Sequence, residues 1–144
     1  MKINEELSRR ITDKYGYLIE KKHCYENVYR LAYRLIGELP KESTTSVLYC
    51  YIFCHGYYLR HAFYVVDGEI VEPLLHLIPD IEVERTITIA QFTIHEYNDM
   101  LLVDERFDLL PSLRKRELAL LSENEELAAH INPIDLIDII REPR

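Results

Sequence analysis

Two short strand-like runs flank the dipeptide Asp67-Gly68, and this arrangement constrains the fold more than any other part of the chain. His61 to Val66 precedes the dipeptide and Glu69 to Leu74 follows it. Asp-Gly suits the two central positions of a type I′ turn, because both positions need a positive φ. The sequence therefore predicts a two-stranded antiparallel hairpin.

The turn also predicts the register of the hairpin. A two-residue turn pairs Val66 with Glu69, and counting away from the turn pairs Phe63 with Glu72. His61 shares a face with Phe63, so Glu72 is its diagonal neighbour at about 7–8 Å between Cα atoms, a gap that a glutamate side chain can cover. Asp67 lies about 20 Å away at ~3.3 Å per residue, and we assign it to the turn alone.

Two further segments have the composition of strands. Val47 to Phe53 is dense in aromatic and β-branched residues, and Glu82 to Ala90 alternates apolar and polar side chains. We expect a loop around His55-Gly56, with Tyr57 and Tyr58 in it, to lead into the hairpin. These segments predict an antiparallel sheet of three or four strands.

Helical spacing of apolar residues, with capping signals, predicts four helices besides the one that follows Cys24. They are residues 3–20 with a break near Gly16, Thr93 to about Val103 after a capping box ending at Glu96, Ser112 to about His130, and a last one from Asn132-Pro133.

The helix that begins at Cys24 is the clearest of the chain. Its apolar face comprises Cys24, Val28, Leu31, Ala32, Leu35 and Ile36, and Gly37 is expected to end it. A helix N-terminus stabilises a thiolate through its partial positive charge and its unpaired N–H groups. The backbone N–H groups of Cys24 and Tyr25 are placed to receive an oxyanion if that thiolate attacks a carbonyl.

These elements predict an α+β domain. The 144 residues suit a single domain, with a core over residues 24–90 and a helical part, residues 91–144, packed on it. A Cys-bearing helix would pack on the small antiparallel sheet, and the C-terminal helices would cover it.

Charge and composition exclude several classes of function. A formal charge of −8 opposes binding to nucleic acid or to an anionic membrane surface. The chain has no apolar run of about 20 residues and no apolar segment typical of a secretion signal, so we expect a cytoplasmic protein with reduced cysteines.

The cysteine spacing argues against a metal site. Cys50 and Cys54 lie on one strand, with His23 and His55 beside cysteines, but a Cys-x3-Cys spacing puts the sulfurs over 10 Å apart at ~3.3 Å per residue. We therefore expect no metal and no cofactor.

Short motifs resemble those of the papain-like and transglutaminase-like cysteine hydrolases and acyltransferases. His61-Ala62-Phe63 is similar to the His-Ala-Trp that opens one strand there, Ile70-Val71-Glu72-Pro73 is similar to a Val-Asp-Pro on the next, and Cys24-Tyr25-Glu26-Asn27 resembles the cysteine segment of arylamine acetyltransferases. The resemblance spans about residues 24–73. It implies that Cys24 is the nucleophile, His61 the general base and acid, and Glu72 the residue that orients His61.

The function hypothesis is a cysteine hydrolase or acyltransferase that works through a thioester on a peptide, protein or small acyl or amide substrate. Asn27, Tyr57 and Tyr58 are the candidates for lining the substrate groove. Phe63 stands where the family has Trp, Glu72 where it has Asp, and the segment before Cys24 has no Gln. These departures motivate the alternative, a catalytically inactive member of the fold that binds or inhibits a protein partner through its C-terminal helices. In that case, Cys24 is a core residue and His61 a structural strand histidine.

Overall fold

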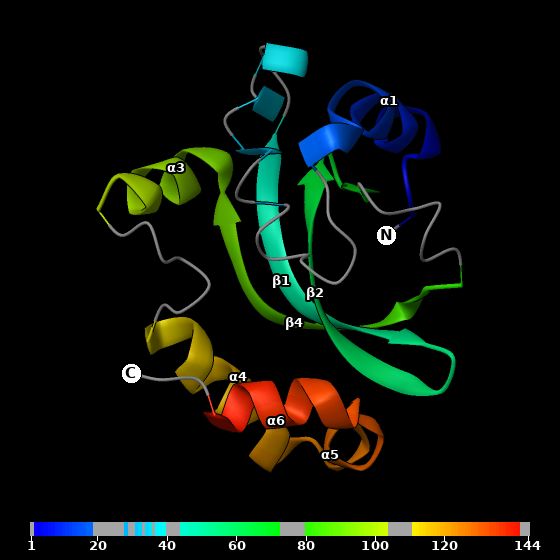
Figure 1. The fold of residues 1–144 in the computed structure, drawn as a ribbon, viewed down its shortest axis with the longest axis vertical. Helices are drawn as coiled ribbons and strands as arrows, with labels where there is room; N and C mark the ends of the chain where they lie inside the picture. The colour runs from blue at the N-terminus through cyan, green and yellow to red at the C-terminus, as the bar shows by residue number, and fades with distance from the viewer. Residues whose placement is uncertain are drawn as a thin grey trace.

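A four-stranded antiparallel sheet forms the centre of the structure, a computed structural model that describes residues 2–18, 28, 31–32, 34–35, 37–39, 44–72, 80–103 and 111–141. Its strands are β1 (Thr45–Cys54), β2 (Tyr57–Val66), β3 (Glu69–Val71) and β4 (Glu82–Thr93), in the order β3-β2-β1-β4 (Figure 1). The predicted α+β class and the antiparallel sheet are therefore confirmed.

Two tight turns connect the first three strands. His55 and Gly56 have φ values of 52° and 86°, and Asp67 and Gly68 have φ values of 49° and 80°. The predicted hairpin is confirmed, including the pairing of Val66 with Glu69. The Asp67 carboxylate accepts the Thr44 N–H at 2.8 Å, which ties the second turn to the start of β1.

The expected loop around His55-Gly56 is wrong. These two residues form the whole connection between β1 and β2, so β2 begins at Tyr57 and not at His61. Histidine is among the residues that tolerate positive φ, and with the following glycine it closes the same kind of turn as Asp67-Gly68. Tyr57 and Tyr58 are consequently strand residues.

The other strands differ from prediction mainly at their ends. β1 begins two residues earlier and ends one residue later than expected, and β4 continues three residues beyond Ala90. β3 ends at Val71, where the sequence predicted a strand to Leu74. Of that predicted continuation, residues 73–74 lie outside the described part of the chain.

The two faces of the sheet carry separate apolar clusters. On one face, which we call the helical face, Tyr49 and Tyr51 of β1 and Tyr64 of β2 belong to a cluster that includes residues of every described helix. On the other, the second face, Leu48, Cys50 and Phe63 pack with Ile70 of β3. All ten residues of β1 are buried, because the strand is covered on both faces.

Five α-helices, each described over its full length, pack against this sheet, and Figure 1 shows α4, α5 and α6 together at one end of it. They are α1 (Glu5–Tyr15), α3 (Ile94–Val103), α4 (Pro111–Glu123), α5 (Glu125–His130) and α6 (Pro133–Arg141). Helix α1 continues as the 3₁₀ turn Gly16–Leu18, at the predicted break. The capping box before α3 is confirmed, since Thr93 and Glu96 exchange side chain to backbone hydrogen bonds.

The single helix predicted from Ser112 to about His130 is wrong. Asn124 interrupts it and caps α5, with its side chain accepting the Leu127 N–H at 3.0 Å. An asparagine followed by two glutamates is a common helix start, because the side chain accepts an N–H and the acids complement the helix dipole. The predicted start of α6 is confirmed, with Asn132 accepting the N–H groups of Ile134 and Asp135.

The predicted helix after Cys24 is described in part. Val28, Leu31, Ala32 and Leu35 are helical and buried on the helical face. Gly37 does not end this helix, because Gly37 and Glu38 are themselves helical.

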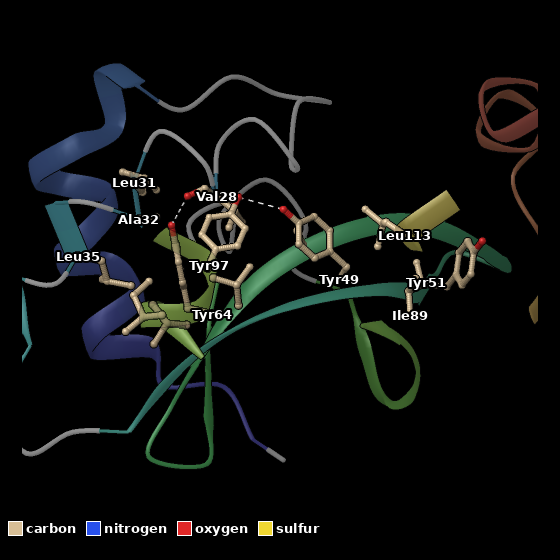
Figure 2. Close-up of a cluster of buried hydrophobic side chains, with 14 of the residues drawn as sticks. Val28, Leu31, Ala32, Leu35, Tyr49, Tyr51, Tyr64, Ile89, Tyr97 and Leu113 are labelled. Carbon is tan, nitrogen blue, oxygen red and sulfur yellow. Dashed lines mark hydrogen bonds between the residues drawn. The ribbon is translucent and has the colours of Figure 1, made fainter. Parts of the chain in front are cut away.

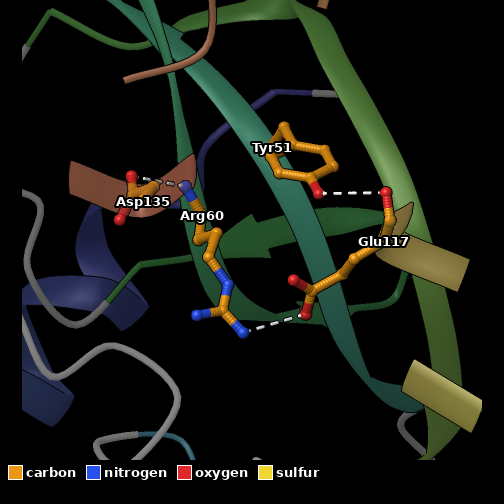
Figure 3. A network of polar contacts seen from close by, with 4 residues as sticks. All are labelled: Tyr51, Arg60, Glu117 and Asp135. Atoms are coloured by element: carbon orange, nitrogen blue, oxygen red, sulfur yellow. Dashed lines mark hydrogen bonds and ion pairs between the residues drawn. The ribbon is translucent and has the colours of Figure 1, made fainter. Parts of the chain in front are cut away.

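Buried and exposed ion pairs attach the C-terminal helices to the sheet. Arg60 of β2 donates to the Glu117 carboxylate of α4 at 3.0 Å, with side-chain exposures of 12% and 0%. The Tyr51 hydroxyl donates to the Glu117 carbonyl, and the Arg60 N–H donates to Asp135 of α6 at 3.1 Å (Figure 3).

Two further contacts attach α5 and the start of α6 to the sheet. The more exposed Arg85 of β4 pairs with Glu126 of α5. The Asn132 N–H donates to the Tyr58 carbonyl, which closes the edge of β2.

Removing one member of the buried pair should destabilise the fold far more than removing one member of the exposed pair. We expect Glu117→Ala to lower the free energy of unfolding by about 3 kcal/mol, because the Arg60 charge loses a carboxylate in buried surroundings. Glu126→Ala, the matched control, should lower it much less, since water screens that pair. Urea denaturation of the two variants measures both values. Equal decreases in the free energy of unfolding would show that burial adds nothing to the contribution of the Arg60–Glu117 pair to stability.

Candidate functional site

A buried histidine and a buried glutamate meet on the second face of the sheet. The His61 Nε2 atom is in hydrogen-bonding contact with the Glu72 Oε2 atom, and the residues are 2% and 1% exposed. His61 comes from the middle of β2, and Glu72 is the first residue after β3. The diagonal neighbourhood that the turn predicts thus brings these two side chains together.

The fold places a thiol beside this pair. Cys50 of β1 is the direct cross-strand partner of His61, and both are buried. Directly opposed residues share a face, with Cβ atoms about 5 Å apart. The Phe63 ring lies edge-on to the His61 ring, at 5.8 Å between centroids. Cys50, His61 and Glu72 therefore form a row across three neighbouring segments of the sheet.

The predicted nucleophile and two of its neighbours lie outside the described residues. These are Cys24, Tyr25 and Asn27, so the meeting of Cys24 with His61 stays a prediction. The nearest described residue of the same segment is Val28, whose carbonyl accepts the Tyr64 hydroxyl on the helical face (Figure 2). His61 faces the other way.

A contact between Cys24 and His61 would have to pass an edge of the sheet. Residues 24 and 28 are at most about 14 Å apart along an extended chain. That length limits how far the Cys24 backbone can lie from Val28 on the helical face.

The two tyrosines expected to line a groove have different environments. Tyr58 is buried on the helical face, with its ring 4.9 Å from the Phe53 ring, so it belongs to the core. Tyr57 is half exposed at the start of β2. Successive strand residues point to opposite faces, so Tyr57 projects from the second face, where His61 also lies.

Two titratable groups near His61 have shifted pKa values. Burial raises the pKa of the Cys54 thiol, and the negative charges of Asp80 and Glu82 add to the rise. Burial also raises the pKa of the Asp135 carboxyl, against the lowering effects of the Arg60 N–H and charge. Cys54 is thus a poor nucleophile at neutral pH, since the thiolate is the reactive form.

Sequence reasoning missed the place of Cys50 at this site. The signal was the turn at His55-Gly56, because a two-residue connection there pairs Cys54 with Tyr57 and, four residues further on, Cys50 with His61. A longer loop would leave that register open. The bond from the Arg60 N–H to Asp135, one residue before His61 in β2, carried no comparable signal.

Within the described ranges, no three His, Cys, Asp or Glu residues are grouped closely enough to hold a metal ion. No described helix is both long and apolar enough to cross a membrane. The chain matches no protein-family model, no curated protein and no solved structure.

The raised pKa of Asp135 predicts a pH-dependent stability. A carboxyl with a higher pKa in the folded state than in the unfolded state destabilises the fold once it ionises. We expect Asp135→Asn, which keeps an oxygen for the Arg60 N–H, to be at least as stable as the parent at pH 7. The difference should vanish as the pH falls below the ordinary value of 3.8, where both forms are uncharged.

Urea unfolding of both proteins at pH 7 and below 3.8 measures this difference, with Asp138→Asn as the control for removing an exposed charge from the same helix. A large loss of stability in Asp135→Asn at pH 7 would contradict the expectation. It would show that attraction to Arg60 outweighs the desolvation of the carboxylate.

Proposed function

We propose that the protein is a cysteine-dependent hydrolase or acyltransferase with a papain-like or transglutaminase-like core. The contact between His61 Nε2 and Glu72 Oε2 carries this proposal. A carboxylate at one ring nitrogen fixes the orientation of an imidazole and stabilises its protonated form. The other nitrogen, Nδ1, is then the atom that exchanges protons with a thiol.

The proposed reaction has two acyl-transfer steps. His61 Nδ1 takes the proton of the thiol, and the sulfur attacks the acyl carbon of the substrate. The resulting oxyanion would be held by the N–H groups of Cys24 and Tyr25. As it collapses, the bond to the leaving amine, alcohol or thiol breaks, and His61 gives that group its proton. Water or an acceptor then attacks the thioester, loses a proton to His61, and the thiol leaves with that proton.

We assign the nucleophile to Cys24 and not to Cys50. Cys50 lies within a strand paired on both sides, so its backbone N–H groups serve the sheet and offer nothing to an oxyanion. Cys24 is predicted at a helix N-terminus, where a thiolate and an oxyanion are both favoured. No organic cofactor or metal enters the proposed steps.

Alkylation by iodoacetamide tests the proposal without knowledge of the substrate. At pH 6 we expect Cys24 to react at least about ten times faster than Cys54, because at that pH only a thiol with a lowered pKa is ionised. His61→Ala should reduce the rate at Cys24 to that of Cys54, and Glu72→Gln should give an intermediate rate. Mass spectrometry of each cysteine-containing peptide over time measures the rates.

Cys54 serves as a control within the same molecule, since its raised pKa keeps it protonated. Cys24→Ser should abolish the fast reaction. Slow and equal labelling of all three cysteines would reject a catalytic thiol. Fast labelling of Cys50 that depends on His61 would overturn the assignment of Cys24, and the nucleophile would then belong to β1.

A second candidate is the catalytically inactive module that binds another protein. The near-complete burial of His61 and Glu72 favours it, because a buried, hydrogen-bonded pair of side chains can be purely structural. So do three isoleucines on α6, spaced three residues apart and 45% to 68% exposed: Ile134, Ile137 and Ile140. Such a stripe suits the apolar surface of a protein partner. Fast, His61-dependent alkylation of Cys24 would exclude this candidate.

A further inference from the structure

Residues 2–4 pair with β3 through a single parallel bridge. The Ile70 N–H donates to the Lys2 carbonyl and the Asn4 N–H donates to the Ile70 carbonyl, both at 2.8 Å. Ile3 lies opposite Ile70. Parallel ladders have evenly spaced bonds. The next bond in this series would therefore join the Glu72 N–H to the Asn4 carbonyl.

In place of that direct bond, the hydroxyl of Ser8 connects the two groups. Asn4 is the N-cap of α1, so its carbonyl already accepts the Ser8 N–H at 3.0 Å. The Ser8 hydroxyl donates to the same carbonyl at 2.7 Å and accepts the Glu72 N–H at 3.0 Å. The Ser8 hydroxyl thus stands between the Asn4 carbonyl and the Glu72 N–H, at the point where the chain enters α1.

The chemistry of Ser8 fits this role better than a role in packing. Serine lowers helix stability relative to alanine, and Ser8 is fully buried, where a hydroxyl needs hydrogen-bond partners. Thr12 offers a comparison one turn later, since its hydroxyl donates to the Ser8 carbonyl within the helix. Of these two hydroxyls, that of Ser8 is the one that bonds to Glu72.

We propose that Ser8 is a positioning residue for the pair formed by His61 and Glu72. Glu72 is the residue whose N–H Ser8 accepts and whose carboxylate contacts the His61 ring. Catalytic groups must be held within about 0.5 Å of their working geometry, and residues behind them supply that precision. Helix α1 therefore sets the carboxylate through one hydroxyl. The inference rests on the proposed function.

The pH dependence of Cys24 alkylation tests this role. At pH 6 we expect Ser8→Ala to react roughly tenfold more slowly than the parent, because a displaced carboxylate orients His61 poorly. At pH 9 the two rates should converge, since the thiolate then forms without help. Thr12→Ala, which removes a hydroxyl from the same helix without touching Glu72, should follow the parent at every pH.

The nitrogen resonances of the His61 ring give a second readout that does not involve the thiol. Nitrogen-15 NMR should show that Ser8→Ala moves the Nε2 signal toward its position in Glu72→Gln, while Thr12→Ala leaves it in place. A folded Ser8→Ala protein with the parental pH profile and the parental Nε2 signal would overturn the inference. If only the proposed function fails, the parent shows slow Cys24 labelling while the Ser8-dependent shift of the signal remains.

Ser8→Thr and Ser8→Val keep the test decisive if Ser8→Ala does not fold. The two side chains have nearly the same size, and only threonine keeps the hydroxyl. We expect Ser8→Thr to retain the parental ring signal and Ser8→Val to lose it. The same signal in both variants would overturn the inference, because the hydroxyl would then have no influence on Glu72.

Discussion

Two tight turns fix the registers that bring Cys50, His61 and Glu72 to one region of the sheet. Positive φ at His55 and Gly56, and again at Asp67 and Gly68, limits each connection to two residues. Because neither turn has an extra residue, β2 pairs in one register with β1 and in one register with β3. A shift of β2 by one residue would turn its side chains to the opposite face of the sheet. The first register puts Cys50 opposite His61 and the second puts Glu72 diagonal to it.

Burial makes the polar contacts of this sheet important for its stability. β1 is covered on both faces, and the two neighbouring positions of β2, Arg60 and His61, each meet a buried carboxylate, on opposite faces. Arg60 meets Glu117 on the helical face and His61 meets Glu72 on the second face. Charged groups in such surroundings need a partner, because desolvation is otherwise costly. β2 is thereby held from the C-terminal helices on one side and from the segment after β3 on the other.

Local signals in the sequence predicted the elements whose cause is local. The hairpin at Asp67-Gly68, the capping box from Thr93 to Glu96 and the start of α6 at Asn132-Pro133 each depend on a few neighbouring residues, and all were predicted correctly. Errors arose where a signal was weaker or competed with another. His55-Gly56 lacks the usual Asn-Gly or Asp-Gly signal of a two-residue turn, Asn124 lies inside a helical pattern, and the helical Gly37 is a weak stop signal.

Chain spacing and turn geometry are enough to predict the α+β class, the strands, several helix ends and the neighbourhood of His61 and Glu72. The contacts of Cys50 with the His61 position, of Arg60 with Glu117 and of the Ser8 hydroxyl with the Glu72 backbone depend on how the elements come together in space. Arg60 and Glu117 are separated by 57 positions in the sequence, and Ser8 and Glu72 by 64. Such contacts arise from the packing of helices on a sheet, and no local pattern of residues encodes which side chains will meet there.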